Sequence, residues 1–222
     1  AGPAQFGPNS FIEFWGDAMN SLYTRNNVYT LQIDHSLARR VDHDNRQPDP
    51  ATPPASYYLQ TTVVDDNHNY SVMAPNGNPW YNQRLSVHAE PGSWDFPLTI
   101  DTDVPDAAPI SFTVDLWGIT AWPAIESDHH VEVLVNDEDV AERRFDGQVT
   151  QRITATFSAD LLNNGDNKLT LHLPAKTGSM FEYIALDRYA ISYPRAFVAR
   201  EGELRFSSAH ELFTVSGLPS AS

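Results

Sequence analysis

The clearest pattern along the chain is an alternation of apolar and polar residues with a period of two. It is cleanest over residues 110–118, where Ile110, Phe112, Val114 and Leu116 share one face. We predict a strand there and in each similar run rich in β-branched and aromatic residues. These further runs are residues 57–64, 85–89, 94–100, 129–135, 140–145, 150–157, 168–173 and 181–193.

Two more β-favouring runs lie near the start of the chain. Residues 11–16 and 27–33 are separated by polar turn formers, so we expect them to pair as strands. Only residues 158–162 have the pattern of a helical turn, which Asn163-Asn164-Gly165 closes. The prediction is an all-β protein, an antiparallel β-sandwich of the jelly-roll (galactose-binding-like) type with one short helical turn.

The 222 residues are enough for one large sandwich. We expect a disordered or cloning-derived lead over residues 1–10 and a single domain over residues 11–194. A proline-rich loop near residues 46–55 interrupts this domain, because proline cannot donate a ladder hydrogen bond. Residues 195–222 are expected to form a C-terminal hairpin or a linker toward a following domain.

The composition narrows the classes of partner. Asp and Glu total 29 against 14 Lys and Arg, which gives a formal net charge of -15. Such a charge opposes binding to phosphate backbones and anionic lipids, so we expect no nucleic-acid partner. No apolar run approaches the roughly 20 residues that span a bilayer, so we expect no membrane insertion. The chain has no cysteine, which excludes a disulfide or a thiolate nucleophile within it.

Two groups of oxygen-bearing side chains follow predicted strands. They are Asp65, Asp66 and Asn67, and Asp101, Asp103 and Asp106. Calcium takes about six to eight oxygen ligands, which such side chains and loop carbonyls can provide. The spacing lacks the central glycine and the closing glutamate of a calcium-binding helix-loop-helix. Two interpretations stay open, a structural calcium ion and ordinary solvated loops.

The triplet Asp128-His129-His130 opens the strand predicted over residues 129–135. The valines of that strand are expected to face the core, with a turn at residues 136–139 and a returning strand that ends at Phe145. Asp-His-His also supplies metal ligands in certain manganese phosphoesterases, where it ends a strand of an α/β fold. The alternatives are a strand entrance with a solvated Asp and two histidines near the sheet edge, or a ligand or metal site completed from elsewhere in the fold.

Exposed aromatic rings are the usual sugar-stacking groups of jelly-roll carbohydrate modules. The tryptophans and the tyrosine to consider are Trp80, Tyr81, Trp94 and Trp122. Trp122 lies in a predicted loop, where exposure is easier than for Trp117 on its strand. The predicted ligand-binding residues are Trp80, Tyr81, Trp122, His129 and His130.

Catalytic patterns are missing from the sequence. There is no Gly-x-Ser-x-Gly nucleophile elbow. Nothing selects a carboxylate pair for glycoside hydrolysis, such as Glu126 with Glu182. We therefore predict that this chain has no catalytic residue and is not an enzyme by itself.

A set of motifs occurs in a fixed order between residues 11 and 194. They are Phe14-Trp15-Gly16-Asp17-Ala18, Tyr23-Thr24, Asn27-Val28-Tyr29-Thr30-Leu31, Pro79-Trp80-Tyr81, Gly118-Ile119-Thr120, Asp128-His129-His130-Val131, Asn136, Phe145-Asp146-Gly147, Leu161-Leu162, Gly165-Asp166-Asn167, Asp187 and Ile191-Ser192-Tyr193-Pro194. In this order the chain resembles the β-rich region that precedes the catalytic domain of bacterial gingipain-like cysteine peptidases. The family's His and Cys dyad is not carried over, since the chain has no Cys to match it.

The resemblance implies a jelly-roll accessory domain of a secreted or cell-surface bacterial protein. It also implies that the partner is the downstream peptidase domain of the same parent chain, which the accessory domain positions or assists. The first alternative function is a carbohydrate-binding module with a glycan partner. The second is the metal-dependent phosphoesterase at Asp128-His129-His130.

Overall fold

The computed structural model describes residues 12, 14, 16, 19, 24–32, 49, 51–100 and 109–219. Its contacts divide the chain into two units, residues 1–45 and 46–222, each of which is considered by itself. In the first unit no described residue belongs to a strand, so the strand predicted over residues 27–33 is wrong for residues 27–32. β-favouring residues alone do not hold a strand without neighbours, because an isolated pair is marginal in water.

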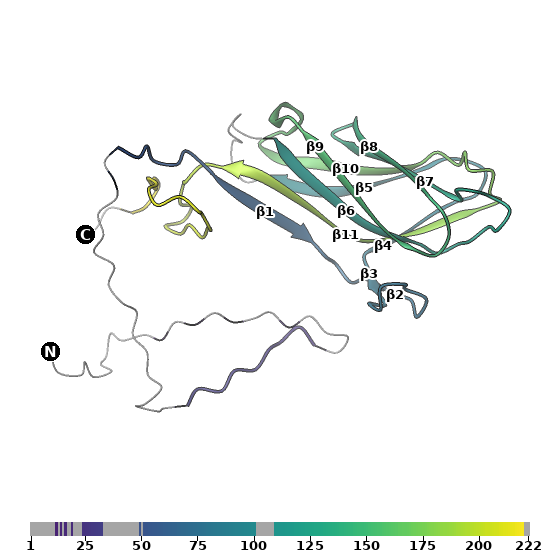
Figure 1. The fold of residues 1–222 in the computed structure, drawn as a ribbon, viewed down its shortest axis with the longest axis horizontal. Coiled ribbons are helices and arrows are strands. Elements are labelled where there is room, and N and C mark those ends of the chain that lie inside the picture. Colours follow the sequence, from purple (N-terminus) through teal and green to yellow (C-terminus); the bar gives the residue numbers. More distant parts are fainter. Residues whose placement is uncertain are drawn as a thin grey trace. The chain divides into compact units, whose positions relative to one another are not determined.

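The second unit is a sandwich of two antiparallel sheets (Figure 1). One sheet has the order β1-β11-β6-β9, with β4 also paired to β11, and the other has the order β5-β10-β7-β8; β2 and β3 form a separate pair. The strands are β1 (Tyr58–Val64), β2 (Asn69–Tyr70), β3 (Trp80–Tyr81), β4 (Gln83–Val87), β5 (Gly92–Ile100), β6 (Ile110–Gly118), β7 (His129–Val135), β8 (Glu138–Phe145), β9 (Thr150–Phe157), β10 (Gly165–Leu173) and β11 (Glu182–Arg195). The predicted all-β jelly-roll sandwich is confirmed.

The helical turn is also present, as the short 3-10 helix η1 (Ala159–Leu161). The side chain of Ser158 accepts a hydrogen bond from the Asp160 N–H at its start. Among the described residues, no helix has the length and apolar character that a membrane crossing requires.

The predicted hairpin is present as β7–β8. Val131, Val133 and Val135 are fully buried, as the alternation required. The turn is tighter than expected, because β8 already begins at Glu138. Asn136 and Asp137 take positive φ angles of 51° and 71°, the two-residue geometry that suits the twist of a hairpin.

The main core lies between the two sheets and is aliphatic and aromatic. It includes Leu85, Ile100, Phe112, Val133, Leu171, Ile184 and Tyr189. A small second cluster lies on the opposite face of β6, where Trp117 packs against Tyr81 and Ala185. The segment that carries β2 and β3 thus covers one end of the outer face of the first sheet.

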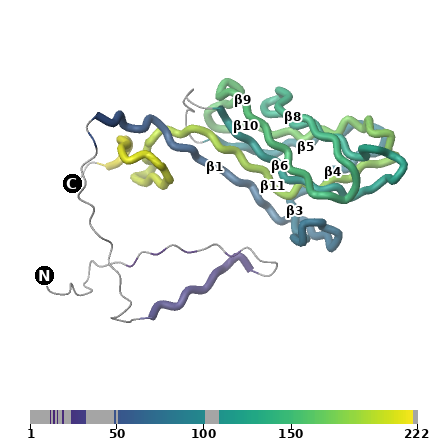
Figure 2. Tube along the Cα trace, in the orientation of Figure 1, coloured from purple at the N-terminus to yellow at the C-terminus, as the bar shows by residue number. Residues whose placement is uncertain are grey.

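The C-terminal tail, predicted to be a hairpin or a linker, belongs to no named strand over residues 196–219. Its described residues 196–219 contain only isolated bridges, such as Val198 with Ser216. The aromatic residues of the tail instead pack on each other, with the Phe197 and Phe213 rings stacked at 5.3 Å and Phe206 at 5.3 Å from Tyr58. Figure 2 shows the tail as loops beside the beginning of β1. Packing of large rings has overridden the local β-pattern.

Candidate functional site

Asp128 lies at one end of the sandwich, directly before β7, and its carboxylate joins two loops. Its exposed fraction is 0%. One oxygen, Oδ2, accepts a hydrogen bond from the Trp122 N–H at 2.8 Å, and Oδ1 accepts one from the Gly147 N–H at 2.8 Å. The solvated Asp expected at this strand entrance is therefore wrong. Buried backbone N–H groups need an acceptor, and Asp128 provides it for both loops.

His129 fills the space behind Asp128 and is also fully buried. Its Nε2 lies 3.1 Å from the carbonyl oxygen of Thr120, so Nε2 carries the proton and donates it. The ring stacks on Phe145 at 4.6 Å. Its Nδ1 lies 3.7 Å from Glu182 Oε1 and has no hydrogen-bond partner.

Glu182 completes this buried polar cluster, which consists of Asp128, His129 and Glu182. Only 1% of Glu182 is exposed, and its Oε1 accepts a hydrogen bond from the His130 N–H at 2.7 Å. Its Oε2 is buried without a partner. Each member of the cluster ties a strand end or loop to its neighbours, so the arrangement serves to hold the end of the sandwich together.

The side chain of His130 is not part of this cluster. It lies on the outer face of the second sheet, beside Glu142 and Arg144. Arg144 has only donors, so its contact of 2.9 Å to His130 Nδ1 fixes that nitrogen as an acceptor. The proton is then on Nε2, which donates to Glu142 Oε1 at 2.6 Å. His129 and His130 thus serve different partners. No group of three or more His, Asp or Glu side chains among the described residues is arranged to hold a metal ion.

The predicted sugar-stacking residues differ in their burial and in their partners. Tyr81 is buried edge-on against Trp117 at 5.5 Å. Trp122 is half-buried, with its Nε1 donating to the Phe181 carbonyl at 2.9 Å. Trp80 is half-buried and meets the exposed Tyr70 edge-on at 5.1 Å. Trp94 packs against the core.

The first oxygen-rich group lies where β1 ends. Asp66 is exposed, whereas Oδ1 of Asp65 and Oδ1 of Asn67 are shielded from water and have no hydrogen-bond partner. Asp101 and Asp103, predicted as the second group with Asp106, lie outside the described residues.

Asp187 is a residue that the sequence did not single out as a ligand. It sits at an irregularity of β11, where the register shifts between Leu186 and Arg188. Its Oδ2 accepts a hydrogen bond from Asn76 Nδ2 at 3.3 Å. Burial, and next the charge of Asp65, raise the pKa of Asp187 to about 6. A single sequence does not reliably indicate where a bulge lies. The sequence therefore did not predict that Asp187 is a partly buried carboxylate.

Replacing Asp187 with asparagine is expected to stabilise the protein at neutral pH. The pKa of Asp187 is higher in the folded state than its ordinary value of 3.8, so the folded state is favoured while the carboxyl is protonated. This contribution is lost as the pH rises through about 6. Because Asp187 is only partly buried, we expect a gain of about 1–2 kcal/mol at high pH, and little at low pH.

Urea unfolding of wild type and Asp187→Asn on either side of this pH range measures the difference. Asp66→Asn, at an exposed neighbouring carboxylate, is the matched control and is expected to change stability little at either pH. An equal effect of Asp187→Asn at both pH values would contradict the raised pKa.

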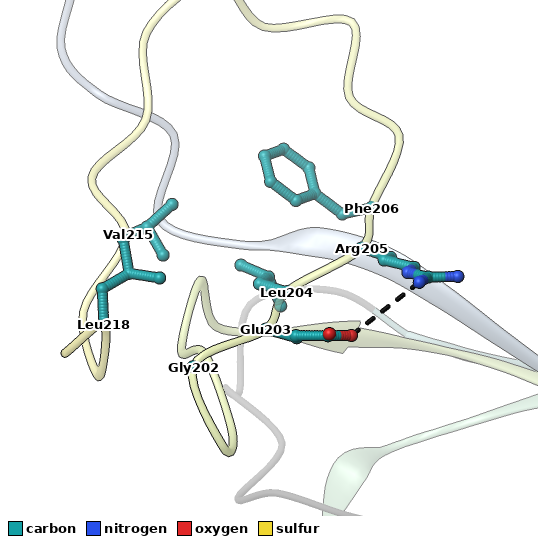
Figure 3. A pocket seen from close by; sticks show the side chains of 7 residues that line it. All are labelled: Gly202, Glu203, Leu204, Arg205, Phe206, Val215 and Leu218. Atoms are coloured by element: carbon teal, nitrogen blue, oxygen red, sulfur yellow. Dashed lines mark ion pairs between the residues drawn. The ribbon is translucent and has the colours of Figure 1, made fainter. Parts of the chain in front are cut away.

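One open cavity lies in the C-terminal tail. Figure 3 shows its apolar side chains, with Leu204 and Phe206 on one segment and Val215 and Leu218 on another. The ion pair at its rim, Arg205 with Glu203 at 3.8 Å, is highly exposed. Such a pair contributes little binding energy, because water screens it.

Comparisons with known proteins show similarity of fold. No family model and no curated protein matches the chain. The crystal structure of dimeric latent PorU from Porphyromonas gingivalis matches with a TM-score of 0.54 and 8% identity, over 72% of this chain and 15% of that chain. The CBM36-1 domain of a multidomain xylanase from the hindgut metagenome of Trinervitermes trinervoides has a TM-score of 0.36 and 14% identity, over 60% of this chain and 96% of that chain. The carbohydrate-binding module CBM36 in complex with calcium and xylotriose has a TM-score of 0.36 and 14% identity, over 59% of this chain and 98% of that chain.

Proposed function

We propose that this chain is a noncatalytic accessory β-sandwich of a secreted or cell-surface gingipain-like cysteine peptidase, in which it positions or assists the downstream catalytic domain. The observation that carries the proposal is the burial of Asp128 and His129, each with an exposed fraction of 0%. These residues belong to the motif order in which the chain resembles the region before gingipain-like catalytic domains. Their contacts are those of a structural support and leave no access for a substrate.

The fold likeness to PorU supports a place within a larger protein. This chain covers 15% of the length of that structure, as one domain among several would. A rigid sandwich suits such a role, because its buried polar cluster fixes the loops at one end. These loops include residues 119–128 and 146–149, which Asp128 links.

The test is binding of this chain to the catalytic domain encoded by the same gene, produced as a separate polypeptide. We expect the two to co-elute in size-exclusion chromatography and the chain to increase the yield of refolded peptidase domain. The chain alone is expected to cleave no peptide substrate. Failure to bind, together with retention on a polysaccharide in affinity electrophoresis, would instead support the carbohydrate-binding alternative.

One observation favours that alternative function. Tyr70 is exposed beside the half-buried Trp80, and Val72 and Met73 of the same segment are exposed as well. Aromatic side chains placed in this way can cover the apolar face of a sugar. If the chain is a glycan-binding module, Tyr70→Ala abolishes retention on the polysaccharide, while Met180→Ala, at an exposed residue elsewhere, leaves it unchanged.

A structural calcium ion is the cofactor that we propose for the loop after β1. Two buried oxygens without partners, on Asp65 and Asn67, support it. Calcium is expected to raise the thermal midpoint of the wild type in differential scanning fluorimetry, and not that of Asp65→Asn. An equal response of both proteins, or none, would argue for ordinary loops.

A further inference from the structure

In the two main sheets of the described chain, the edge strands β5, β8, β9 and β4 each carry a feature that opposes pairing with another chain. Edge strands are ordinarily protected by charges, by proline or by a bulge, since their free backbone groups would otherwise accept a foreign strand. β5 contains Asp95 and Pro97. β8 contains Arg143 and Arg144, and the register of its pairing with β7 shifts. β9 and β4 contain Arg152 and Arg84.

β1 has none of these protective features. Its sequence from Tyr58 to Val64 has no charged residue and no proline, and it pairs with β11 in an unbroken register over its full length. Its other edge is paired with no strand in the part of the chain that the structure describes. On its outward face Leu59 and Val63 are 59% and 52% exposed. Figure 1 shows the strand at the margin of its sheet.

We propose that the outer edge of β1, from Leu59 to Val63, is a dimerisation edge, occupied by β1 of a second copy of this chain in an antiparallel pair centred on Thr61. The two first sheets then join into one continuous sheet. In this register Leu59 of each copy lies opposite Val63 of the other, and the two Thr61 residues face each other. The contact is isologous, as a twofold symmetric dimer requires.

The charges on the paired strands do not oppose a second copy as the occupant. The whole chain carries a net charge of -15, so two copies repel each other over most of their surfaces. In the proposed register, however, Asp65 falls opposite Tyr57, and Asp66 falls opposite Ser56. No acidic residue of one copy therefore faces an acidic residue of the other along the paired strands. Cross-strand apolar pairs of this kind stabilise antiparallel sheets.

Sedimentation equilibrium of the full chain over a range of protein concentrations tests the proposal. The wild type is expected to be dimeric at high concentration. Val63→Lys places two charges against Leu59 side chains and is expected to weaken the dimer at least about tenfold. Met180→Lys, the same chemical change at a residue that is 73% exposed and outside β1, is the control and is expected to leave the association constant unchanged.

Two double variants test the register itself. Leu59→Lys with Val63→Lys puts lysine opposite lysine twice and is expected to give a monomer at all concentrations. Leu59→Glu with Val63→Lys puts glutamate opposite lysine twice and is expected to restore the dimer. Both residues point to solvent in one copy, so circular dichroism should show both variants folded.

A wild type that is still monomeric at about 0.5 mM protein would overturn the proposal. The dissociation constant of the dimer would then be too high for a specific association. Equal weakening by Val63→Lys and Met180→Lys, or a monomeric Leu59→Glu, Val63→Lys variant, would overturn the proposal as well. The dimer does not depend on the accessory role, so either proposal can fail while the other stands.

Discussion

Asp128→Ala is expected to lower the free energy of unfolding by about 3–5 kcal/mol, the loss typical of a broken buried charge network. The substitution leaves the backbone N–H groups of Trp122 and Gly147 without their acceptor. It also removes the carboxylate that lies 3.5 Å from His129 Nε2. Urea unfolding followed by tryptophan fluorescence measures the loss.

Two further variants separate the role of the carboxylate from that of bulk. Asp128→Asn keeps one acceptor oxygen but turns an NH2 group toward the other N–H, so we expect a loss of about 2–4 kcal/mol. Asp146→Ala, at an exposed acid near the same loop, is expected to cost less than about 0.5 kcal/mol. A loss below about 1 kcal/mol for Asp128→Ala would mean that the loops find other acceptors.

Gly118→Ala is expected to destabilise the protein by about 3 kcal/mol or more, because the added methyl group has no room. A Cβ at Gly118 would meet the carbonyl oxygen of Gly147 at 2.1 Å and Nε2 of His129 at 2.5 Å. Neither atom can move aside easily, since His129 is fully buried and Gly147 is held by Asp128. The midpoint of thermal unfolding is expected to fall accordingly.

Gly178→Ala provides the comparison for this effect. Its backbone φ of 86° strains an alanine, yet a Cβ there would meet nothing within 4 Å. We expect a loss of about 1 kcal/mol from the backbone strain alone. If the two alanine variants lost the same stability, close packing at Gly118 would not be the reason for the glycine.

The alternation of side chains predicted the strands of the sandwich well, because burial of one face leaves a direct mark on the sequence. β6 has the predicted bounds, and the valines of β7 face the core. The same reasoning failed for residues 27–32, where the residue types favour a strand that the described residues do not form. A strand needs a neighbouring strand to pair with, and the residue types of a segment do not show whether the fold places one beside it.

The buried polar cluster was only partly predictable. Asp128 and His129 stood out as a polar motif at a strand entrance, but their burial depends on two loops and on Glu182, which lies far along the chain. Glu182 had no sequence feature to distinguish it from other glutamates. Its partner, the N–H of His130, is a backbone group that every residue has. Contacts of this kind are set by the tertiary fold, not by local pattern.

The position of β11 in the first sheet also bears on the order in which the chain folds during synthesis. β11 is the common neighbour of β1, β4 and β6, yet among the described strands it is made after all the others. While the ribosome is still translating the segment before Glu182, these three strands lack the partner that joins them. Closing this sheet requires pairing between distant parts of the sequence, which is slow. The nascent chain therefore has a long interval in which a chaperone has exposed strands to protect.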